Sequence, residues 1–400
     1  MYADWEQYRA LALQMLRPSQ RDLEHGLELH HNSFVFDAYG FLPGGGGPAP
    51  HIDQLISEKA SPEELKAAVE LFRSNTSYLE NPDMQLKLRQ ALDYAGVDCI
   101  FQNAGVEGSC AEDMLKRLSC YTYLADALPE IFERAVFPRQ LESIRARNHK
   151  ALYLSTNGVP LPPKRYSAAE TLEHIAVFFR LGVRMMHLTY NRRNLIGDGC
   201  AESSDAGLSD FGRMVIAEMN RAGVIPDVAH SGQKTSLEAA LVSKKPVVAS
   251  HSVAGALTYH YRGKSDEVLE AIKKSGGYIG ICGIPRFLSG SRNICTMMDH
   301  IEYVARKFGV DHVAIGTDRS TPLASLQLTE TSPGSRKIWE SYWPDPGDGG
   351  SKVTEDEFNS MTWVNWPLFT VGLVQKGFTD EEIQKIIGGN VRRVAEETLA

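Results

Sequence analysis

Short apolar runs alternate with helix-like stretches along most of this sequence, and the alternation limits the folds that the chain can form. Most of the runs are rich in β-branched or aromatic residues, as buried parallel strands are. We expect strands at about eight places. They cover residues 32–39, 97–101, 150–155, 185–189, 225–229, 246–250, 278–282 and 312–316.

Helical patterns fill the intervals between the expected strands. Ser209 is a suitable N-cap for a helix that runs to residue 221, and Gly223 stands where such a helix would end. Ser265 begins a similar stretch that runs to residue 274. Further helices are expected at 167–181, 235–241 and 297–308. A regular strand–helix alternation predicts βα units and a parallel sheet.

The number of βα units favours a closed (β/α)8 TIM barrel of the α/β class over an open sheet. No G-x-G-x-x-G follows the first strand, so a dinucleotide-binding fold is disfavoured. The 400 residues then form a single domain, 1–400, with an N-terminal helix and insertions on one rim. The glycine run at 44–47 and the irregular stretch 329–355 are expected to be such insertions.

Charge and composition exclude several classes of function. The net charge of −8 argues against a nucleic-acid binder and against a protein of the membrane surface. No apolar run is long enough for a membrane helix, and the N-terminus resembles no signal peptide. The 6 cysteines form no C-x-x-C and are expected to be reduced. We therefore expect a cytoplasmic protein that acts on a small molecule, without nucleic-acid or membrane partners.

Two histidines and an aspartate stand at the ends of expected strands. His230 and His251 end consecutive strands, and Asp318 ends a later one. In a barrel these three residues would face a common pocket at the C-terminal mouth. Two imidazoles and a carboxylate suit a divalent cation, zinc above all.

The sequence resembles the membrane (renal) dipeptidase family over about residues 26–397, most densely between 181 and 320. The resemblance implies a metal-dependent (β/α)8 hydrolase in which two zinc ions, bridged by a glutamate and a hydroxide, cleave dipeptides and related amides. It also implies a homodimer. The matching motifs are LTYN at 188–191, GDGCAE at 197–202, GLSDFG at 207–212, DVAHSG at 227–232, SHS at 250–252, Arg262, IGTD at 315–318 and GGNVRRV at 388–394.

The resemblance also implies roles for individual residues. His230 and His251 match the histidine ligands of one metal, and Asp318 matches the acid that orients the attacking water. Arg262 matches the arginine that holds the carboxylate of the substrate, for which a guanidinium is well suited. Tyr190 stands where some members carry a catalytic histidine, and Tyr190 and Asn191 are expected to contact the substrate.

Three positions depart from the pattern of the family. The family's first strand carries D-G-H-N-D, whereas this chain has Tyr39 in place of the histidine and Phe41 in place of the second aspartate. Asn157 replaces the bridging glutamate. These are the ligands of one metal and the bridge, so we expect one zinc-like ion on His230 and His251. Tyr39 and Asn157 then become candidate catalytic residues.

Three arrangements of the site stay open at this stage. A single metal on the two histidines could be completed by Asp318, Asn157 or water. A carboxylate from elsewhere could rebuild the site, with Glu107 or the pair His51 and Asp53 as candidates. The site could also be free of metal, with the histidines, Asp318 and Tyr39 serving in acid–base chemistry or in binding.

The reaction that we expect is hydrolysis of a peptide or amide bond in a small substrate that carries a carboxylate. Proton transfer or elimination on a small polar metabolite is an alternative, as is binding without catalysis.

His187 alternates with apolar neighbours and is expected to face the helical layer. The tryptophans 339, 343, 363 and 366 are expected to pack beneath a long loop.

Overall fold

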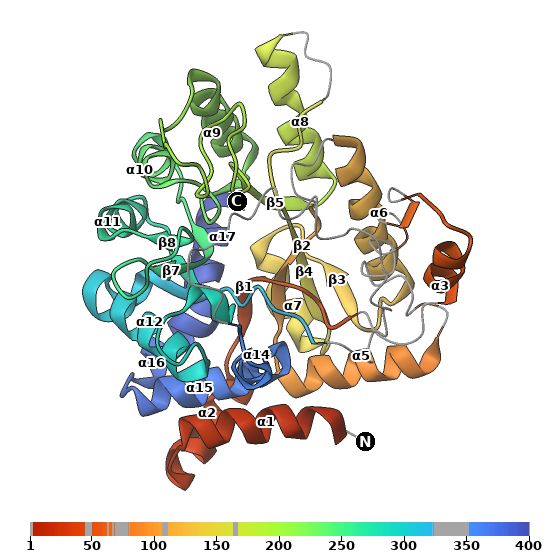
Figure 1. Ribbon diagram of the computed structural model, residues 1–400, viewed down its shortest axis with the longest axis vertical. Helices are drawn as coiled ribbons and strands as arrows, with labels where there is room; N and C mark the ends of the chain where they lie inside the picture. Colours follow the sequence, from red (N-terminus) through yellow and green to blue (C-terminus); the bar gives the residue numbers. More distant parts are fainter. Residues whose placement is uncertain are drawn as a thin grey trace.

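The computed structural model describes residues 3–44, 50–61, 64–65, 68, 79, 81–105, 111–162, 167–321, 323 and 352–399. Within them the strands form two parallel sheets, which curl around a common centre (Figure 1). In the first sheet, β3 (Phe132–Arg134) pairs with one side of β4. The other members, in spatial order, are β1 (Phe36–Gly40), β2 (Cys99–Asn103), β4 (Lys150–Thr156), β5 (Val183–His187) and β6 (Ile225–Asp227). The second sheet runs β10 (Val313–Ile315), β9 (Ile279–Ile281), β7 (Ala249–Ala254) and β8 (Gly263–Lys264).

Backbone hydrogen bonds join the two sheets at both seams. At the seam between β6 and β7, the amide of Val228 donates to the carbonyl of Val248 at 2.8 Å. At the other seam, the amide of Asp318, just after β10, donates to the carbonyl of Tyr39 in β1 at 2.9 Å. The ring β1–β2–β4–β5–β6–β7–β9–β10 is therefore continuous, which confirms the (β/α)8 barrel.

Helices surround the strands, and α15 packs against α2 beneath the barrel (Figure 1). Local sequence explains their limits: Ser209 caps α9 by accepting from the amide of Gly212, and Gly223 ends it in a left-handed conformation with φ 83°. The helices are α1 (Ala3–Leu16), α2 (Gln20–Asn32), α3 (Pro50–Ser57), α5 (Pro82–Ala95), α6 (Ala111–Ala127), α7 (Leu141–Ala146), α8 (Ala168–Arg180), α9 (Asp210–Ala222), α10 (Gln233–Val242), α11 (Asp266–Lys274), α12 (Ile294–Phe308), α14 (Glu355–Ser360), α15 (Trp366–Gln375), α16 (Asp380–Gln384) and α17 (Asn390–Leu399). No helix in the described ranges is long and apolar enough to cross a membrane.

Aromatic side chains fill part of the barrel interior. Phe36, at the start of β1, stacks on Phe101 with ring centroids 5.2 Å apart, and Phe101 stacks on Tyr153 at 5.4 Å. All three side chains are buried. Because the interior is packed in this way, polar chemistry is confined to the residues at and beyond the carboxyl ends of the strands.

The predicted strands are all present, but β3 and β8 were not predicted. β8 is a Gly-Lys pair and β3 is three residues long, so neither carries a hydrophobic period. Helix α12 begins at Ile294, earlier than expected, because Asn293 caps it. Most of the glycine run and most of 329–355, including Trp339 and Trp343, lie outside the described residues. Trp363 and Trp366 are buried.

Candidate functional site

Three histidines meet inside the barrel, near the carboxyl ends of neighbouring strands. His187 is the last residue of β5, His230 follows β6, and His251 lies in β7. Their ring centroids are 4.9–5.3 Å apart. All three side chains are buried, and they form one compact cluster.

The imidazoles of His230 and His251 face each other through their Nε2 atoms, which are 2.9 Å apart. The outer nitrogens are held from behind: Nδ1 of His230 lies 2.6 Å from Oδ1 of Asn191, and Nδ1 of His251 lies 2.7 Å from Oγ of Ser250. Since Oδ1 of Asn191 can only accept, Nδ1 of His230 carries the proton in this arrangement. The lone pair of His230 Nε2 therefore points toward His251, where either a proton or a cation can bind.

Burial keeps this pair of imidazoles neutral. Desolvation, and next the positive charge of Arg262, hold the pKa of His230 and the pKa of His251 well below the usual range. Neutral imidazoles with fixed tautomers are what a metal site requires.

Tyrosine rings cover the two histidines. Tyr39 stacks on His251 with centroids 3.8 Å apart, and its hydroxyl donates to Oδ1 of Asn157 at 2.9 Å. Tyr190 stacks on His230 at 4.1 Å. Tyr39 and Asn157 stand where the resemblance predicts a histidine ligand and the bridging glutamate. These two positions thus hold a phenol that is hydrogen-bonded to an amide. Phe41 adds an edge contact to the Tyr39 ring at 6.0 Å.

Arg262 and Asn191, both predicted to bind substrate, are fully buried. The guanidinium of Arg262 donates from Nε to the carbonyl of Ala229 at 3.1 Å and from Nη2 to the carbonyl of His251 at 2.6 Å. Asn191 contacts His230, as described above. Both side chains are therefore placed where they support the histidine pair, and their contact with substrate stays a prediction.

Asp318 is half-buried and has a left-handed backbone, with φ 53°. Such a conformation is unfavourable for a residue other than glycine and is found more often at functional sites. Its Oδ2 lies 3.9 Å from Sγ of Cys282. Its main chain is hydrogen-bonded to Tyr39, so Asp318 belongs to the same end of the barrel as the histidines.

The prediction for His187 is wrong, because its ring faces the interior. Its Nε2 lies 2.7 Å from Oδ2 of Asp227, and its ring lies 5.3 Å from that of Tyr39. Asp227, the last residue of β6, was also missed. Both residues are polar and end a strand, which is the signal that identified His230 and His251.

The candidates for a rebuilt site lie apart from this cluster or cannot be placed. Asp53 is exposed on α3, and the side chain of His51 and all of Glu107 fall outside the described residues. Among the residues that are placed, the one group with ligand atoms close enough for a metal ion is His187, Asp227 and His251.

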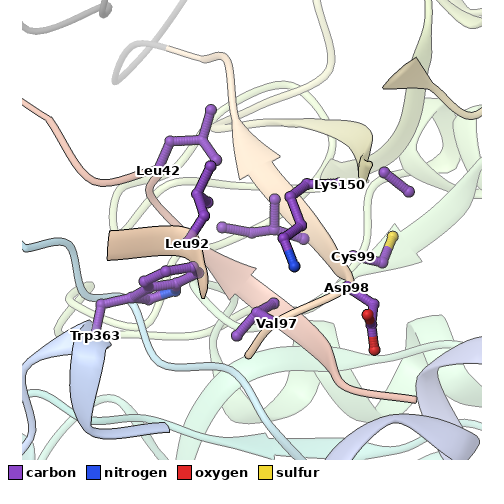
Figure 2. Close-up of a pocket in the computed structure, with 9 residues that line it drawn as sticks. Leu42, Leu92, Val97, Asp98, Cys99, Lys150 and Trp363 are labelled. Carbon is purple, nitrogen blue, oxygen red and sulfur yellow. The ribbon is translucent and has the colours of Figure 1, made fainter. Parts of the chain in front are cut away.

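A separate pocket lies near the first residues of β2 and β4 (Figure 2). Its lining includes Trp363, Leu42 and the polar residues Asp98 and Lys150. Asp98 accepts a hydrogen bond from the amide of Val35 at 2.9 Å, so it is engaged in holding the fold. The histidines do not line this pocket, which we regard as structural.

A parallel barrel with a buried histidine pair near the carboxyl ends of its strands is the architecture of barrel metallohydrolases. The family description "Membrane dipeptidase (Peptidase family M19)" matches residues 64–333, and the chain belongs to this family.

Individual relatives agree with this assignment. Dipeptidase tcpJ of Claviceps purpurea is 31% identical over 228 residues, which are 56% of this chain and 46% of that protein. The match thus spans about half the length of this relative. Two solved structures from Pseudomonas aeruginosa share the fold. An amidohydrolase is 23% identical with a TM-score of 0.68, covering 93% of this chain and 98% of its own. The probable dipeptidase PvdM is 19% identical with a TM-score of 0.67, covering 95% and 99%.

Proposed function

We propose that this protein is a metal-dependent hydrolase that cleaves a peptide or amide bond in a small substrate bearing a carboxylate. The observation that carries the proposal is the pair of facing Nε2 atoms of His230 and His251, 2.9 Å apart, in a barrel of the dipeptidase family. Relatives named dipeptidase and probable dipeptidase agree with this chemistry.

The residues present fit one metal ion better than two. The two buried imidazoles offer nitrogen donors whose outer nitrogens are already hydrogen-bonded, as in zinc sites. At the position expected for a second metal, the phenol of Tyr39 is hydrogen-bonded to Asn157. Phe41 offers no donor atom there. We propose one zinc ion, which when bound supplies Lewis acidity and lowers the pKa of a coordinated water.

The remaining roles follow from chemistry and placement. Asp318 is the proposed general base, because it is a half-buried carboxylate at the mouth of the barrel. Arg262 is the proposed clamp for the carboxylate of the substrate. Tyr190 and Asn191 are proposed to position His230 and the substrate around it.

Tyr39 and Asn157 also favour a second candidate function. A phenol and an amide in place of metal ligands suit the same barrel with a diverged reaction, such as proton transfer or elimination, or binding without catalysis. The two candidates differ in their products, because hydrolysis of an amide consumes water and releases an amine together with a carboxylic acid, whereas elimination leaves a double bond.

The test uses the full chain with a panel of dipeptides and small N-acyl amino acids, assayed for release of amine with and without a chelator. We expect turnover that the chelator abolishes and that the double variant His230→Ala, His251→Ala lacks. The matched control is His25→Gln, which alters an exposed histidine on α2 and should leave turnover unchanged. Absence of amine release by the unmodified protein on every substrate would refute the hydrolase.

A further inference from the structure

His187 and Asp227 form a buried pair directly beside the two facing histidines. They end neighbouring strands, β5 and β6, and are register partners across them. Both side chains have an exposed fraction of 0%, and Nε2 of His187 lies 2.7 Å from Oδ2 of Asp227. The function proposed above makes no use of either residue.

Three polar atoms of this pair have no well-directed hydrogen bond. Nδ1 and Nε2 of His187 and Oδ2 of Asp227 are buried, and none has a hydrogen-bond partner among the described residues. The 2.7 Å approach is thus a close contact of ion-pair distance whose angle falls short of a well-directed hydrogen bond. Buried polar atoms are rarely left unsatisfied in native proteins, so these three atoms indicate a missing partner.

His251 completes the group with a third donor. One ligand atom from each of His187, Asp227 and His251 can be chosen so that all three lie within 4.8 Å of one another. Two imidazole nitrogens and one carboxylate oxygen form a donor set of catalytic zinc sites. We propose that His187 and Asp227 are ligands of the bound metal and that, with His251, they supply the donors that Tyr39, Phe41 and Asn157 cannot provide.

Backbone amides fix the carboxylate of Asp227 from the side away from the histidines, as expected for a metal ligand. Its Oδ1 accepts from the amides of Ala229 at 2.9 Å and Ser250 at 3.1 Å, which leaves Oδ2 directed at the cluster. The orientation of the carboxylate is therefore fixed from behind.

The competing interpretation is a buried His–Asp ion pair that only supports the fold. Such a pair would place the proton of His187 Nε2 on a line to Oδ2, which satisfies both atoms. Here both remain unsatisfied at 2.7 Å, and Nδ1 on the far side of the ring is unsatisfied as well. A cation accounts for the convergence of all three side chains, which an ion pair between His187 and Asp227 does not require.

The inference rests on the proposed function because both assume that the chain binds one metal ion. Its test measures the affinity for Zn²⁺ and not turnover. Full-length protein stripped of metal is titrated with Zn²⁺ in competition with a chromophoric chelator. The variants are His187→Gln and Asp227→Asn, which retain size and, for Asn, the Oδ1 acceptor. The matched control is Tyr153→Phe, since this buried hydroxyl in the barrel has no hydrogen-bond partner among the described residues.

We expect one Zn²⁺ per chain in the unmodified protein and in the control. Each variant should lose more than about 100-fold in affinity, which exceeds the 10–100-fold typical of residues that only orient a ligand. Mg²⁺ should not compete, because it prefers oxygen donors. Variants that bind Zn²⁺ as tightly as the unmodified protein would overturn the inference and leave the proposed hydrolase standing.

Two other outcomes separate the claims further. Zinc binding that the variants abolish, without hydrolysis of any substrate, supports the metal site and refutes the hydrolase. No zinc binding by the unmodified protein overturns both. If a variant does not fold, anomalous diffraction from zinc-loaded crystals of the unmodified protein decides. A zinc peak among His187, Asp227 and His251 supports the inference, and a peak on His230 and His251 alone overturns it.

Discussion

The ring of Tyr39 stacks on the ring of His251 with centroids 3.8 Å apart and an interplanar angle of 11°. The hydroxyl of Tyr39 also donates to Asn157 at 2.9 Å, so the ring is fixed at both ends. The Tyr39 ring therefore occupies the position where the resemblance to the family predicts a metal-binding histidine, and the histidine and aspartate donors lie on β5 and β7 and at the end of β6.

Restoring the lost ligands should restore the second metal. The triple variant Tyr39→His, Phe41→Asp, Asn157→Glu supplies an imidazole and two carboxylates where the family has them. We expect the metal content, measured by plasma mass spectrometry, to rise from one ion per chain to two. The control Tyr39→Phe keeps the stacked ring without the hydroxyl and should stay at one.

The support of Asn191 for His230 should be visible in the affinity for zinc. Asn191→Ala removes the acceptor that fixes the tautomer of His230, so we expect a loss of about 10–100-fold, as for other residues that orient a ligand. Asn191→Asp keeps an acceptor and should lose less. Equal affinities for Asn191→Ala and the unmodified protein would show that the contact does not orient the histidine.

Arg262 should affect both stability and substrate recognition. Its guanidinium donates to two carbonyls, those of Ala229 and His251, which an ammonium group cannot bridge in the same way. Arg262→Lys should lower the free energy of unfolding by about 2–3 kcal/mol, the usual scale for a lost charged hydrogen bond. It should also raise KM for substrates with a free carboxylate. Carboxamide analogues of the same substrates should have the same KM in both proteins, and a matching rise for them would contradict the clamp.

Acid should destabilise the fold through His30, which lies buried between α2 and α15. Burial lowers the pKa of His30 to about 4, and its two nitrogens contact Oγ1 of Thr370 at 2.8 Å and the carbonyl of Ala95 at 2.9 Å. Below pH 6.5 the unfolded chain binds a proton here that the folded chain does not. Stability therefore falls as the pH drops from about 6.5 to about 4, by up to about 3 kcal/mol from this group.

The measurement for His30 is chemical denaturation between pH 4 and pH 7 in the unmodified protein and in His30→Gln. The difference between the two free energies of unfolding should shrink or reverse toward acid. A difference that is constant across this range would show that His30 does not titrate differently in the two states.

The fold could be predicted from the sequence because its signals are local. Apolar runs, the N-caps Ser209 and Ser265, and Gly223 each mark an element boundary by its own chemistry. The residues His230 and His251 were found for a similar reason, since each follows an apolar run of the sequence. Their contact at 2.9 Å needed the structure, because sequence positions do not give the distance between strands.

His187 and Asp227 are polar residues at strand ends, but the sequence pattern does not show which face of the strand they occupy. Every residue of β5 and of β6 is buried, so alternation along these strands does not separate the face toward the barrel from the face toward the helices. Only the register of β5 against β6, and the position of His251 in the next strand, bring these two residues together. Their placement depends on the closed ring of strands.

The metal content of the purified full chain tests the central claim most directly, which is that this family member works with one metal ion. The protein is loaded with Zn²⁺, freed of excess ion and measured by plasma mass spectrometry against its concentration. We expect one zinc per chain, lost in the double variant His230→Ala, His251→Ala. Two zinc ions per chain, or none, would contradict the claim.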